Sequence, residues 1–484
     1  MKREFFVNII FLLAVNLLIK PFYIFGIDRT VQNLTGEAEY GLYFSLLAVI
    51  YMLQALNDLG LRNFNNRTIA QHPHLLDKLM GHVLGLKVVL AIFFGMVLLG
   101  ASFLLGYDSP REHFILLVLW LNQVLISLTL YFRSNISGVG AYRTDSVLSA
   151  LNKFLAILIV GALILFGPKP FRIEYFVLGE FASLFLTATV AFVLNRNKLR
   201  GPLRIRFNGL YFRSILRQSF PFALIILLTS IYTRIDTIML RQLLADGTVE
   251  AGIYAAGYRL LDAVNMIGFL FAGLLLPIFS KMLKQREDVA PLVQTSAQFI
   301  WAGAIPLAIG AVTFQTEIME LLYDEATPYY GRVLAPLMLS FVAVAGNYIY
   351  GTLLTANGNL RRMNILFAVS IPINALLNAW LIPYYGAVGA GWATFATQSA
   401  VLLAQMELAR SIVGLRFNAT MAVRLLVFVV GISGVGYGLA HHFLLDWWVK
   451  WVLLFGVAVT LAFLLNLMEW RNALDYLRRS KKLD

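Results

Sequence analysis

Eight ionisable side chains interrupt the long apolar stretches of this sequence. A charge in the middle of a membrane-spanning helix costs roughly 2.5–3.5 kcal/mol or more when it faces lipid, so such residues should face one another or a cavity. Lysine and arginine in a cavity can replace the hydration of an anionic group, above all a phosphate, with charge-assisted hydrogen bonds. The eight residues are Lys20, Lys87, Lys153, Glu180, Arg234, Asp236, Arg259 and Asp262.

Four of the positive residues are candidates for binding an anionic substrate in such a cationic cavity: Lys20, Lys153, Arg234 and Arg259. At 1.5 Å per residue, Arg234 lies about 9 Å and Arg259 about 12 Å from the predicted outer ends of their helices. Lys20 falls in an outer half and Lys153 in an inner half, whereas Lys87 is close enough to the inner end of its helix to reach the interface. The alternative is that these charges only pair with one another and lock helices together.

Three acidic residues, Glu180, Asp236 and Asp262, are candidates for charge pairing or for taking up a coupling ion. A buried carboxylate beside an arginine can bind H⁺ or Na⁺ and bias one conformation, and the alternative is a permanent salt bridge. Arg259 and Asp262 are three residues apart and share a helix face, whereas Arg234 and Asp236 are two apart and cannot. An Arg234–Asp262 or an Asp236–Arg259 pair between neighbouring helices would satisfy the remaining charges.

The composition excludes an ordinary soluble protein. Of the 484 residues, 59% are hydrophobic and 13% are charged, and the mean hydropathy is +0.75, whereas a soluble domain has about 25% charged residues. Cysteine is absent, so neither a disulfide nor a thiolate site can form. The sequence has no nucleophile–base constellation and no ATP-binding loop, and we expect no catalytic residues, no metal and no cofactor.

Hydropathy predicts an all-α integral membrane protein of fourteen transmembrane helices, since each span needs about 20 apolar residues. The basic start and the apolar run after it lack a small-residue cleavage site, so we interpret them as a retained first helix. The predicted spans are 5–27, 40–60, 81–106, 113–136, 146–167, 173–195, 218–240, 251–280, 292–315, 330–354, 363–382, 386–410, 419–440 and 447–469.

Basic residues alternate from loop to loop along these spans. Most of the 39 Lys and Arg residues fall in the segments that are cytoplasmic if the N-terminus is inside, including 196–217 and the run 471–482. Acidic residues such as Asp28 and Glu39 fall in the opposite segments. This asymmetry satisfies the positive-inside rule and places both termini in the cytoplasm. The net charge of +13 therefore reflects topology, and we expect no nucleic-acid partner.

Two short matches indicate an internal repeat. Residues 39–43 (EYGLY) match 250–254 (EAGIY), and residues 140–143 (GAYR) match 358–361 (GNLR) at nearly the same offset. Two six-helix lobes in the same orientation would enclose a central cavity; the alternative is chance recurrence of short glycine–aromatic patterns. The predicted parts are an N-lobe (1–195), a basic cytoplasmic linker (196–217), a C-lobe (218–410) and helices 13–14 with a basic tail (411–484).

Several of these segments resemble the polysaccharide-biosynthesis flippases, the Wzx-type transporters of lipid-linked oligosaccharides in the multidrug/oligosaccharidyl-lipid/polysaccharide exporter superfamily. The resemblance covers roughly residues 5–410. The motifs are 36–43 (GEAEYGLY) with 58–61 (DLGL), 234–236 (RID), 252–260 (GIYAAGYRL) with 276–278 (LPI), and 374–378 (NALLN) with 382–390 (IPYYGAVGA).

The resemblance implies a fourteen-helix, two-lobed transporter that works by alternating access. It would move an undecaprenyl-diphosphate-linked oligosaccharide from the cytoplasmic to the periplasmic leaflet of the bacterial inner membrane, for O-antigen or another surface polysaccharide. Related branches move the peptidoglycan precursor, lipid II, or export drugs with a coupling cation. The first helix lacks the arginines associated with the lipid II branch, since Lys20 is its only basic residue within the span.

The expected partners follow from this resemblance: the polyprenyl-diphosphate-linked glycan, the bilayer, H⁺ or Na⁺ and the polysaccharide polymerase machinery. We expect the protein to be a monomer. A membrane-embedded glycosyltransferase or polymerase is the competing class, but it would need a large periplasmic loop or an acidic catalytic motif, and the sequence has neither.

Overall fold

The computed structural model describes residues 18–199, 201–415 and 418–467; the regular elements of this part of the chain are all helices, joined by loops, with no β-strand. The predictions for residues 1–17 of the first span and for the basic run 471–482 lie outside the described residues. The chain divides into two compact units, Met1–Ala255 (the N-terminal unit) and Ala256–Asp484 (the C-terminal unit). The predicted boundaries of the lobes remain a prediction.

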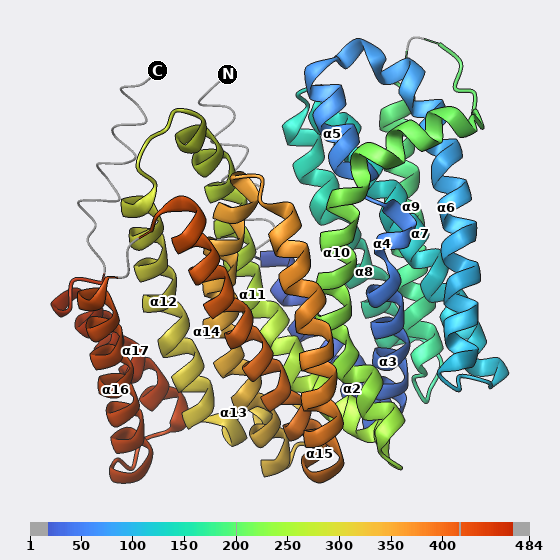
Figure 1. The fold of residues 1–484 in the computed structure, drawn as a ribbon. Helices are drawn as coiled ribbons and strands as arrows, with labels where there is room; N and C mark the ends of the chain where they lie inside the picture. The colour runs from blue at the N-terminus through green and yellow to red at the C-terminus, as the bar shows by residue number, and fades with distance from the viewer. Residues whose placement is uncertain (1–17, 200, 416–417, 468–484) are drawn as a thin grey trace. The chain divides into compact units, whose positions relative to one another are not determined.

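The N-terminal unit is a bundle of helices drawn in blue to light green in Figure 1. Helix α7 packs on α5 and α9, α8 on α9, and α10 on α3. The elements are η1 (Tyr23–Asp28), α2 (Arg29–Thr35), α3 (Glu37–Leu53), α4 (Ala55–Asp58), α5 (Leu61–Gln71), η2 (Pro73–Leu75), α6 (Leu76–Leu104), α7 (Pro110–Gly138), α8 (Tyr142–Phe166), α9 (Ile173–Arg196), α10 (Gly209–Leu243) and the start of α11 (Gly247–Lys284).

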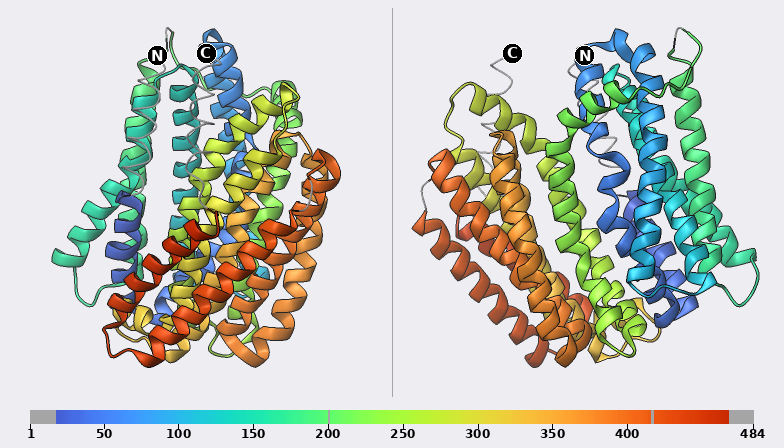
Figure 2. Two further views of the ribbon diagram at one scale, coloured as in Figure 1. Left: turned by 90° about the vertical axis from the view of Figure 1, so that its left-hand side faces the viewer. Right: turned by 45° about the vertical axis from the view of Figure 1, so that its right-hand side comes forward.

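The C-terminal unit contains the rest of α11 and six further helices. Helix α14 packs on α12, α13 and α15, and α16 and α17 lie side by side against α12 (Figures 1 and 2). The elements are α12 (Ala290–Thr313), α13 (Gln315–Leu322), α14 (Pro328–Ala356), α15 (Leu360–Val413), α16 (Ala419–His442) and α17 (Trp447–Leu464).

Helix α15 doubles back on itself and supplies two of the predicted spans. Its backbone leaves the helical conformation at Gly386, where φ is 58° and ψ is −135°. The Asn374 side-chain amide donates to Thr397 Oγ1 at 3.2 Å, although a straight helix would separate these residues by about 35 Å. The Tyr329 hydroxyl bridges the break, because it accepts from Ala387 N–H and donates to the Tyr385 carbonyl.

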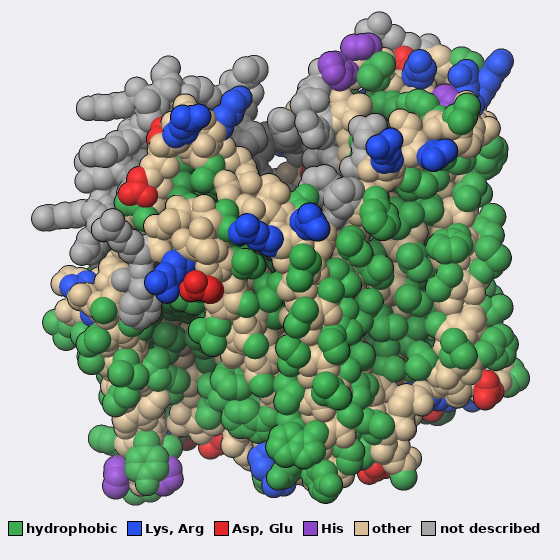
Figure 3. Space-filling model, viewed as in Figure 1, with side chains coloured by type: hydrophobic (Ala, Val, Ile, Leu, Met, Phe, Trp, Pro, Cys, Tyr) green, Lys and Arg blue, Asp and Glu red, His purple; other side chains and the backbone are tan. Residues whose placement is uncertain are grey.

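Eleven helices of the described residues are long and apolar enough to cross a membrane. On the visible face of the N-terminal unit, hydrophobic side chains cover the middle of the helices, Lys and Arg gather at one end, and acidic side chains lie at the other (Figure 3). This distribution is the one that a hydrocarbon layer imposes on a protein surface. The chain is an all-α integral membrane protein, and the count of fourteen spans stays a prediction.

The matched glycines of the predicted repeat meet each other in the N-terminal unit. A Cβ on Gly41 would lie 1.8 Å from the Thr248 carbonyl oxygen, and a Cβ on Gly252 would lie 2.1 Å from the Glu37 carbonyl oxygen. Gln32 Nε2 donates to the Gly252 carbonyl at 2.9 Å. The contact is reciprocal, because each glycine faces the residue four positions before the other, and only glycine permits so close an approach of two helices.

Charged residues fasten the helix ends at the side predicted to face outward. Arg111 binds both Glu39 and Glu174, which joins α7 to α3 and α9. Arg241 of α10 binds Glu112 at 2.8 Å and lies 3.8 Å from the centre of the Tyr107 ring. Burial raises the pKa of the Tyr107 hydroxyl, so this ring stays neutral beneath the guanidinium.

Two residues sit differently from their sequence interpretation. Lys87 does not reach the interface, because its side chain is 2% exposed and its Nζ binds Asp58 at 2.8 Å and Ser127 at 2.7 Å. Asp28 is not a loop residue in water, since it is 2% exposed and accepts a hydrogen bond from the Tyr40 hydroxyl at 2.7 Å. In both cases a polar partner on another segment offsets part of the free energy that the side chain loses when it leaves water.

The glycine contact is testable by Gly252→Ala. The new methyl group would overlap backbone that cannot rotate away, so we expect a loss of about 1–3 kcal/mol or more of stability. Thermal unfolding of the purified protein in detergent measures the effect. Gly438→Ala is the matched control, because no atom lies within 4 Å of that Cβ and alanine is the better helix former. An equal loss in both variants would contradict the contact.

Candidate functional site

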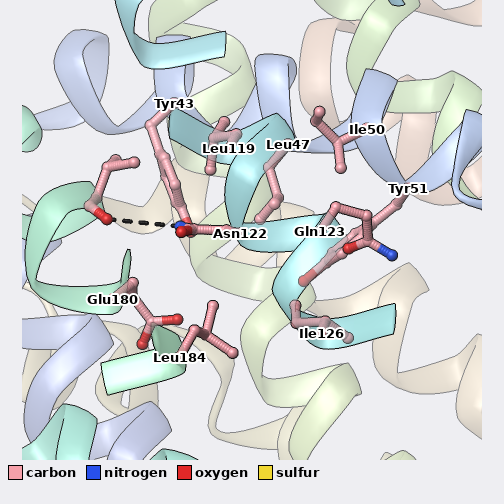
Figure 4. Close-up of a pocket in the computed structure, with 11 residues that line it drawn as sticks. Tyr43, Leu47, Ile50, Tyr51, Leu119, Asn122, Gln123, Ile126, Glu180 and Leu184 are labelled. Atoms are coloured by element: carbon pink, nitrogen blue, oxygen red, sulfur yellow. Dashed lines mark hydrogen bonds between the residues drawn. The ribbon is translucent and has the colours of Figure 1, made fainter. Parts of the chain in front are cut away.

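A small polar pocket lies within the helices of the N-terminal unit (Figure 4). Its volume is about 40 Å³, which is enough for one or a few water molecules. Helices α3, α7 and α9 supply its walls. The lining residues are Tyr43, Leu47, Ile50, Tyr51, Leu119, Asn122, Gln123, Ile126, Val177, Glu180 and Leu184.

Glu180, whose side chain lines the pocket, pairs with Lys153 of α8 at 3.5 Å. The Lys153 ammonium also lies 3.6 Å from the centre of the Tyr23 ring, a cation–π geometry that is stabilising in a desolvated site. The sequence placed Lys153 in an inner and Glu180 in an outer half, and their long side chains bring the two charged groups together. The predicted candidates Lys153 and Glu180 therefore belong to one cluster.

Lys20 is half-buried in the first described helical turns of the chain. Arg133 and Lys153 act on it as like charges. Among residues 18–199, 201–415 and 418–467, no carboxylate forms an ion pair with Lys20. It therefore adds positive charge to the side of the cluster that holds Lys153.

Arg234 does not line the pocket, but it contacts the ring of one of the lining residues. Its guanidinium carbon is 5.1 Å from the centre of the Tyr51 ring, and Tyr51 lines the pocket. Nearby, Gln54 joins α3 to α7 and α10, because it accepts from Gln123 Nε2 and donates to Ser230 Oγ, both at 3.3 Å. Arg234 and Lys153 thus each contact a residue that lines the pocket, Tyr51 and Glu180 respectively.

Asp236 points away from Arg234, as residues two apart on a helix must. Its side chain is 1% exposed, and the Tyr254 hydroxyl donates to its Oδ2 at 3.1 Å.

In the C-terminal unit, Arg259 and Asp262 form the predicted i,i+3 contact at 3.7 Å. The side chains are 14% and 27% exposed, so the pair is only partly covered by the protein. The ring of Tyr348 packs against Gly268, which lies one to two turns further along α11; a Cβ on Gly268 would lie 2.3 Å from this ring. The negative charge of Asp262 acts on the Tyr348 hydroxyl. A second charged cluster, with a tyrosine beside it, thus occupies this unit.

Lys87 and Asp58 are ionisable groups whose pairing the sequence did not predict; the Lys87 side chain is 2% exposed and that of Asp58 is 26% exposed. Asp58 belongs to the 58–61 motif, in which Leu59 and Gly60 adopt left-handed conformations (φ 41° and 77°). The break between α4 and α5 holds the carboxylate beneath α6, where it meets Lys87. The only signal in the sequence was that a lysine in a span needs a partner.

Within the described ranges no group of three or more His, Cys, Asp or Glu residues could hold a metal ion.

Charged residues inside apolar spans, with aromatic side chains beside them, often mark substrate or ion pathways in membrane proteins. The family model described as polysaccharide biosynthesis protein matches residues 6–283. The chain belongs to this family.

The sequence is also similar to lipid III flippases. It is 26% identical over 383 residues to the lipid III flippases of Escherichia coli (strain K12) and Shigella flexneri, which covers 75% of this chain and 88% of each relative.

Solved structures share the fold. The lipid II flippase MurJ in an inward closed conformation superposes with a TM-score of 0.63 at 14% identity, covering 97% of this chain and 98% of MurJ. An inward-facing multidrug resistance MATE family transporter of the MOP superfamily gives 0.62 at 14% identity, covering 84% of this chain and 98% of that one. At these identities the likeness establishes the fold alone.

The Lys87–Asp58 pair should be structural, and Lys87→Met tests this. The substitution leaves the Asp58 carboxylate without its cation, and we expect a loss of about 3 kcal/mol, seen as a lower unfolding temperature in detergent. The double variant Lys87→Met/Asp58→Asn should regain part of the loss, because it removes the uncompensated charge. If the single variant kept wild-type stability, the pair would not be structural.

Proposed function

We propose that this protein is a flippase of polyprenyl-diphosphate-linked oligosaccharides. It moves the lipid from the cytoplasmic to the periplasmic leaflet of the bacterial inner membrane, with both termini in the cytoplasm, for O-antigen or other surface polysaccharide synthesis. The observation that carries the proposal is the positive charge beside the small pocket: Lys153 contacts the pocket residue Glu180 at 3.5 Å, and the Arg234 guanidinium lies 5.1 Å from the ring of the pocket residue Tyr51. Lys20 is proposed to add to this charge.

The chemistry of the cargo fits these residues. The polyprenyl tail can stay in the bilayer, but the diphosphate must exchange its hydration for other donors, and lysine and arginine supply them. Sugars need hydrogen bonds and flat apolar surfaces, which Asn122, Gln123 and Tyr51 offer at the pocket wall. Arg259 of the C-terminal unit is the fourth proposed substrate-binding residue, and the predicted two-lobed arrangement would allow alternating access.

The family and the curated relatives favour a lipid-linked glycan over a drug. The family is that of polysaccharide biosynthesis, and the relatives in Escherichia coli and Shigella flexneri are named for a lipid-linked substrate. The likeness to MurJ keeps a lipid II flippase as the second candidate. A cation-coupled multidrug exporter is the third, on the likeness to a MATE transporter.

Coupling to H⁺ or Na⁺ is proposed to run through Glu180, Asp236 or Asp262. Glu180 is the strongest of the three candidates, because its carboxylate lines the pocket and contacts Lys153. Protonation of Glu180 would release Lys153 for the diphosphate. We further propose that the protein works as a monomer and delivers its product to the polysaccharide polymerase machinery.

Lys153→Ala tests the cationic site. A fluorescent diphosphate-linked oligosaccharide is placed in liposomes with the purified protein, and transfer to the opposite leaflet is followed by a membrane-impermeant quencher. We expect transfer to fall by about tenfold or more, since a charge-assisted hydrogen bond contributes about 1.5–3 kcal/mol. Lys153→Arg should keep part of the activity, because the charge remains. Wild-type transfer by Lys153→Ala would refute the role of this residue.

Arg259→Ala should abolish transfer in the same assay while the protein stays folded in the membrane. Arg410→Ala is the matched control, because Arg410 also contacts an acid three residues away, Glu407 at 3.4 Å, but is 64% exposed. Loss of transfer in Arg410→Ala as well would show that the assay reports general damage to the protein. Normal transfer by Arg259→Ala would count against a cationic site in the C-terminal unit.

A further inference from the structure

The basic segment that precedes α10 packs against α6 of the N-terminal unit. The sequence from 196 to 235 contains no Asp or Glu. Arg206 N–H donates to the Gly81 carbonyl of α6 at 3.1 Å. A Cβ on Gly81 would lie 2.1 Å from the Arg204 carbonyl oxygen, and one on Gly85 would lie 2.4 Å from that of Arg206. Two glycines of α6 thus hold this segment in place by close backbone contact.

The first turns of α10 extend beyond the apolar span. The helix begins at Gly209, where the Asn208 side chain accepts from Tyr211 N–H at 3.1 Å, whereas the span predicted from hydropathy begins at residue 218. The Tyr211 ring packs against His82 of α6, with ring centres 4.5 Å apart. These first turns are therefore anchored at the membrane boundary that the charge pattern predicts to be cytoplasmic.

A groove of about 1130 Å³ lies along these turns. Its lining contains two arginines, a serine and four apolar side chains, all of them from α10. Arg213 and Arg217 are exposed and four residues apart, so they share a helix face. Leu210 and Phe220, which flank them, are 84% and 56% exposed. The lining residues are Gly209, Leu210, Phe212, Arg213, Ser214, Leu216, Arg217 and Phe220.

We propose that this groove is the entry site at which the diphosphate head of the lipid-linked substrate first binds, from the leaflet beside α10. The inference rests on the proposed function and adds two residues to it. Arg213 and Arg217 are one helical turn apart, so each guanidinium can bind one phosphate of the diphosphate by paired N–H···O bonds. Leu210 and Phe220 offer the apolar surface on which the first part of the tail can lie.

The geometry of α10 connects the groove to the proposed substrate-binding residues. At 100° per residue, Arg213 and Arg234 lie within about 60° of each other around the helix, about 30 Å apart along it. The side chains of the same face between them, Phe220, Leu224, Leu227 and Ile231, are exposed or half-buried. One accessible face of α10 therefore leads from the two arginines to Arg234.

A diphosphate lipid fits the groove better than an ordinary anionic phospholipid. A phospholipid such as phosphatidylglycerol presents a single phosphate diester with one charge, which needs one guanidinium. A diphosphate presents two linked anionic groups, which match two arginines on one face. The experiment must therefore distinguish binding of the diphosphate lipid from binding of phosphatidylglycerol.

The experiment uses the full chain in nanodiscs of phosphatidylcholine, with a fluorescent polyprenyl-diphosphate-linked oligosaccharide as the probe. For Arg213→Ala/Arg217→Ala we expect the apparent Kd to rise about tenfold, as for the loss of one to two exposed charge-assisted bonds. Arg213→Gln/Arg217→Gln should behave alike and guards against a folding defect of the alanine variant. Arg361→Ala/Arg362→Ala, which removes another exposed arginine pair, should keep the wild-type Kd.

Competition identifies the occupant. Excess phosphatidylglycerol should leave probe binding almost unchanged in the wild type. Equal competition by phosphatidylglycerol, or a wild-type Kd in both double variants at 213 and 217, would overturn the entry site. If the wild type transfers the probe between leaflets but these variants bind it normally, only this inference fails. If the wild type neither binds nor transfers the probe, the proposed function itself fails.

Discussion

The cost of holding a charge in an apolar environment governs the arrangement of this protein. Each ion in a span must keep a polar partner, because the loss of hydration exceeds the energy of almost any single packing contact. Lys87 meets Asp58 and Ser127, Lys153 meets Glu180 and the Tyr23 ring, and Asp236 meets Tyr254. All of these partners lie on other helical elements, so the charged contacts join particular helices to one another.

Close backbone contact is the second constraint, and it acts where no side chain fits. Gly41 and Gly252 face each other's helices reciprocally, and these are the matched positions of the two short repeats in the sequence. A pseudo-two-fold axis between α3 and the start of α11 would bring such equivalent residues together. Gly81 and Gly85 apply the same principle to the basic segment, which contacts α6 through its own carbonyl groups.

The sequence predicted what composition and local spacing determine. Hydropathy was sufficient for the all-α membrane class, and the two spans at 363–382 and 386–410 correspond to the two arms of α15 on either side of Gly386. The i,i+3 spacing predicted the Arg259–Asp262 contact. The family followed from motifs that local sequence preserves.

Contacts between helices could not be predicted in the same way. Nothing in the spacing of Lys153 and Glu180 indicates that the two side chains meet, since this depends on how α8 packs on α9. Lys87 was expected at the interface because its depth was judged from its own helix alone, whereas Asp58 on α4 provides the partner that keeps it buried. The roles of the site residues in transport rest on chemistry, and they stay proposals.

The two lysine–carboxylate pairs of the N-terminal unit differ in the distance between their charged groups and in the exposure of their lysines. Lys87 and Asp58 are 2.8 Å apart, Ser127 holds the same ammonium, and the lysine side chain is 2% exposed. An incoming anion would have to break two short bonds to a buried ammonium group. Lys153 and Glu180 are 3.5 Å apart, near the limit of a hydrogen bond, and the lysine is 28% exposed. Its ammonium rests partly on the Tyr23 ring, which a phosphate need not displace. Under the proposed function, the diphosphate would take Lys153 from Glu180, whereas Lys87 would stay with Asp58 and keep the surrounding helices in place.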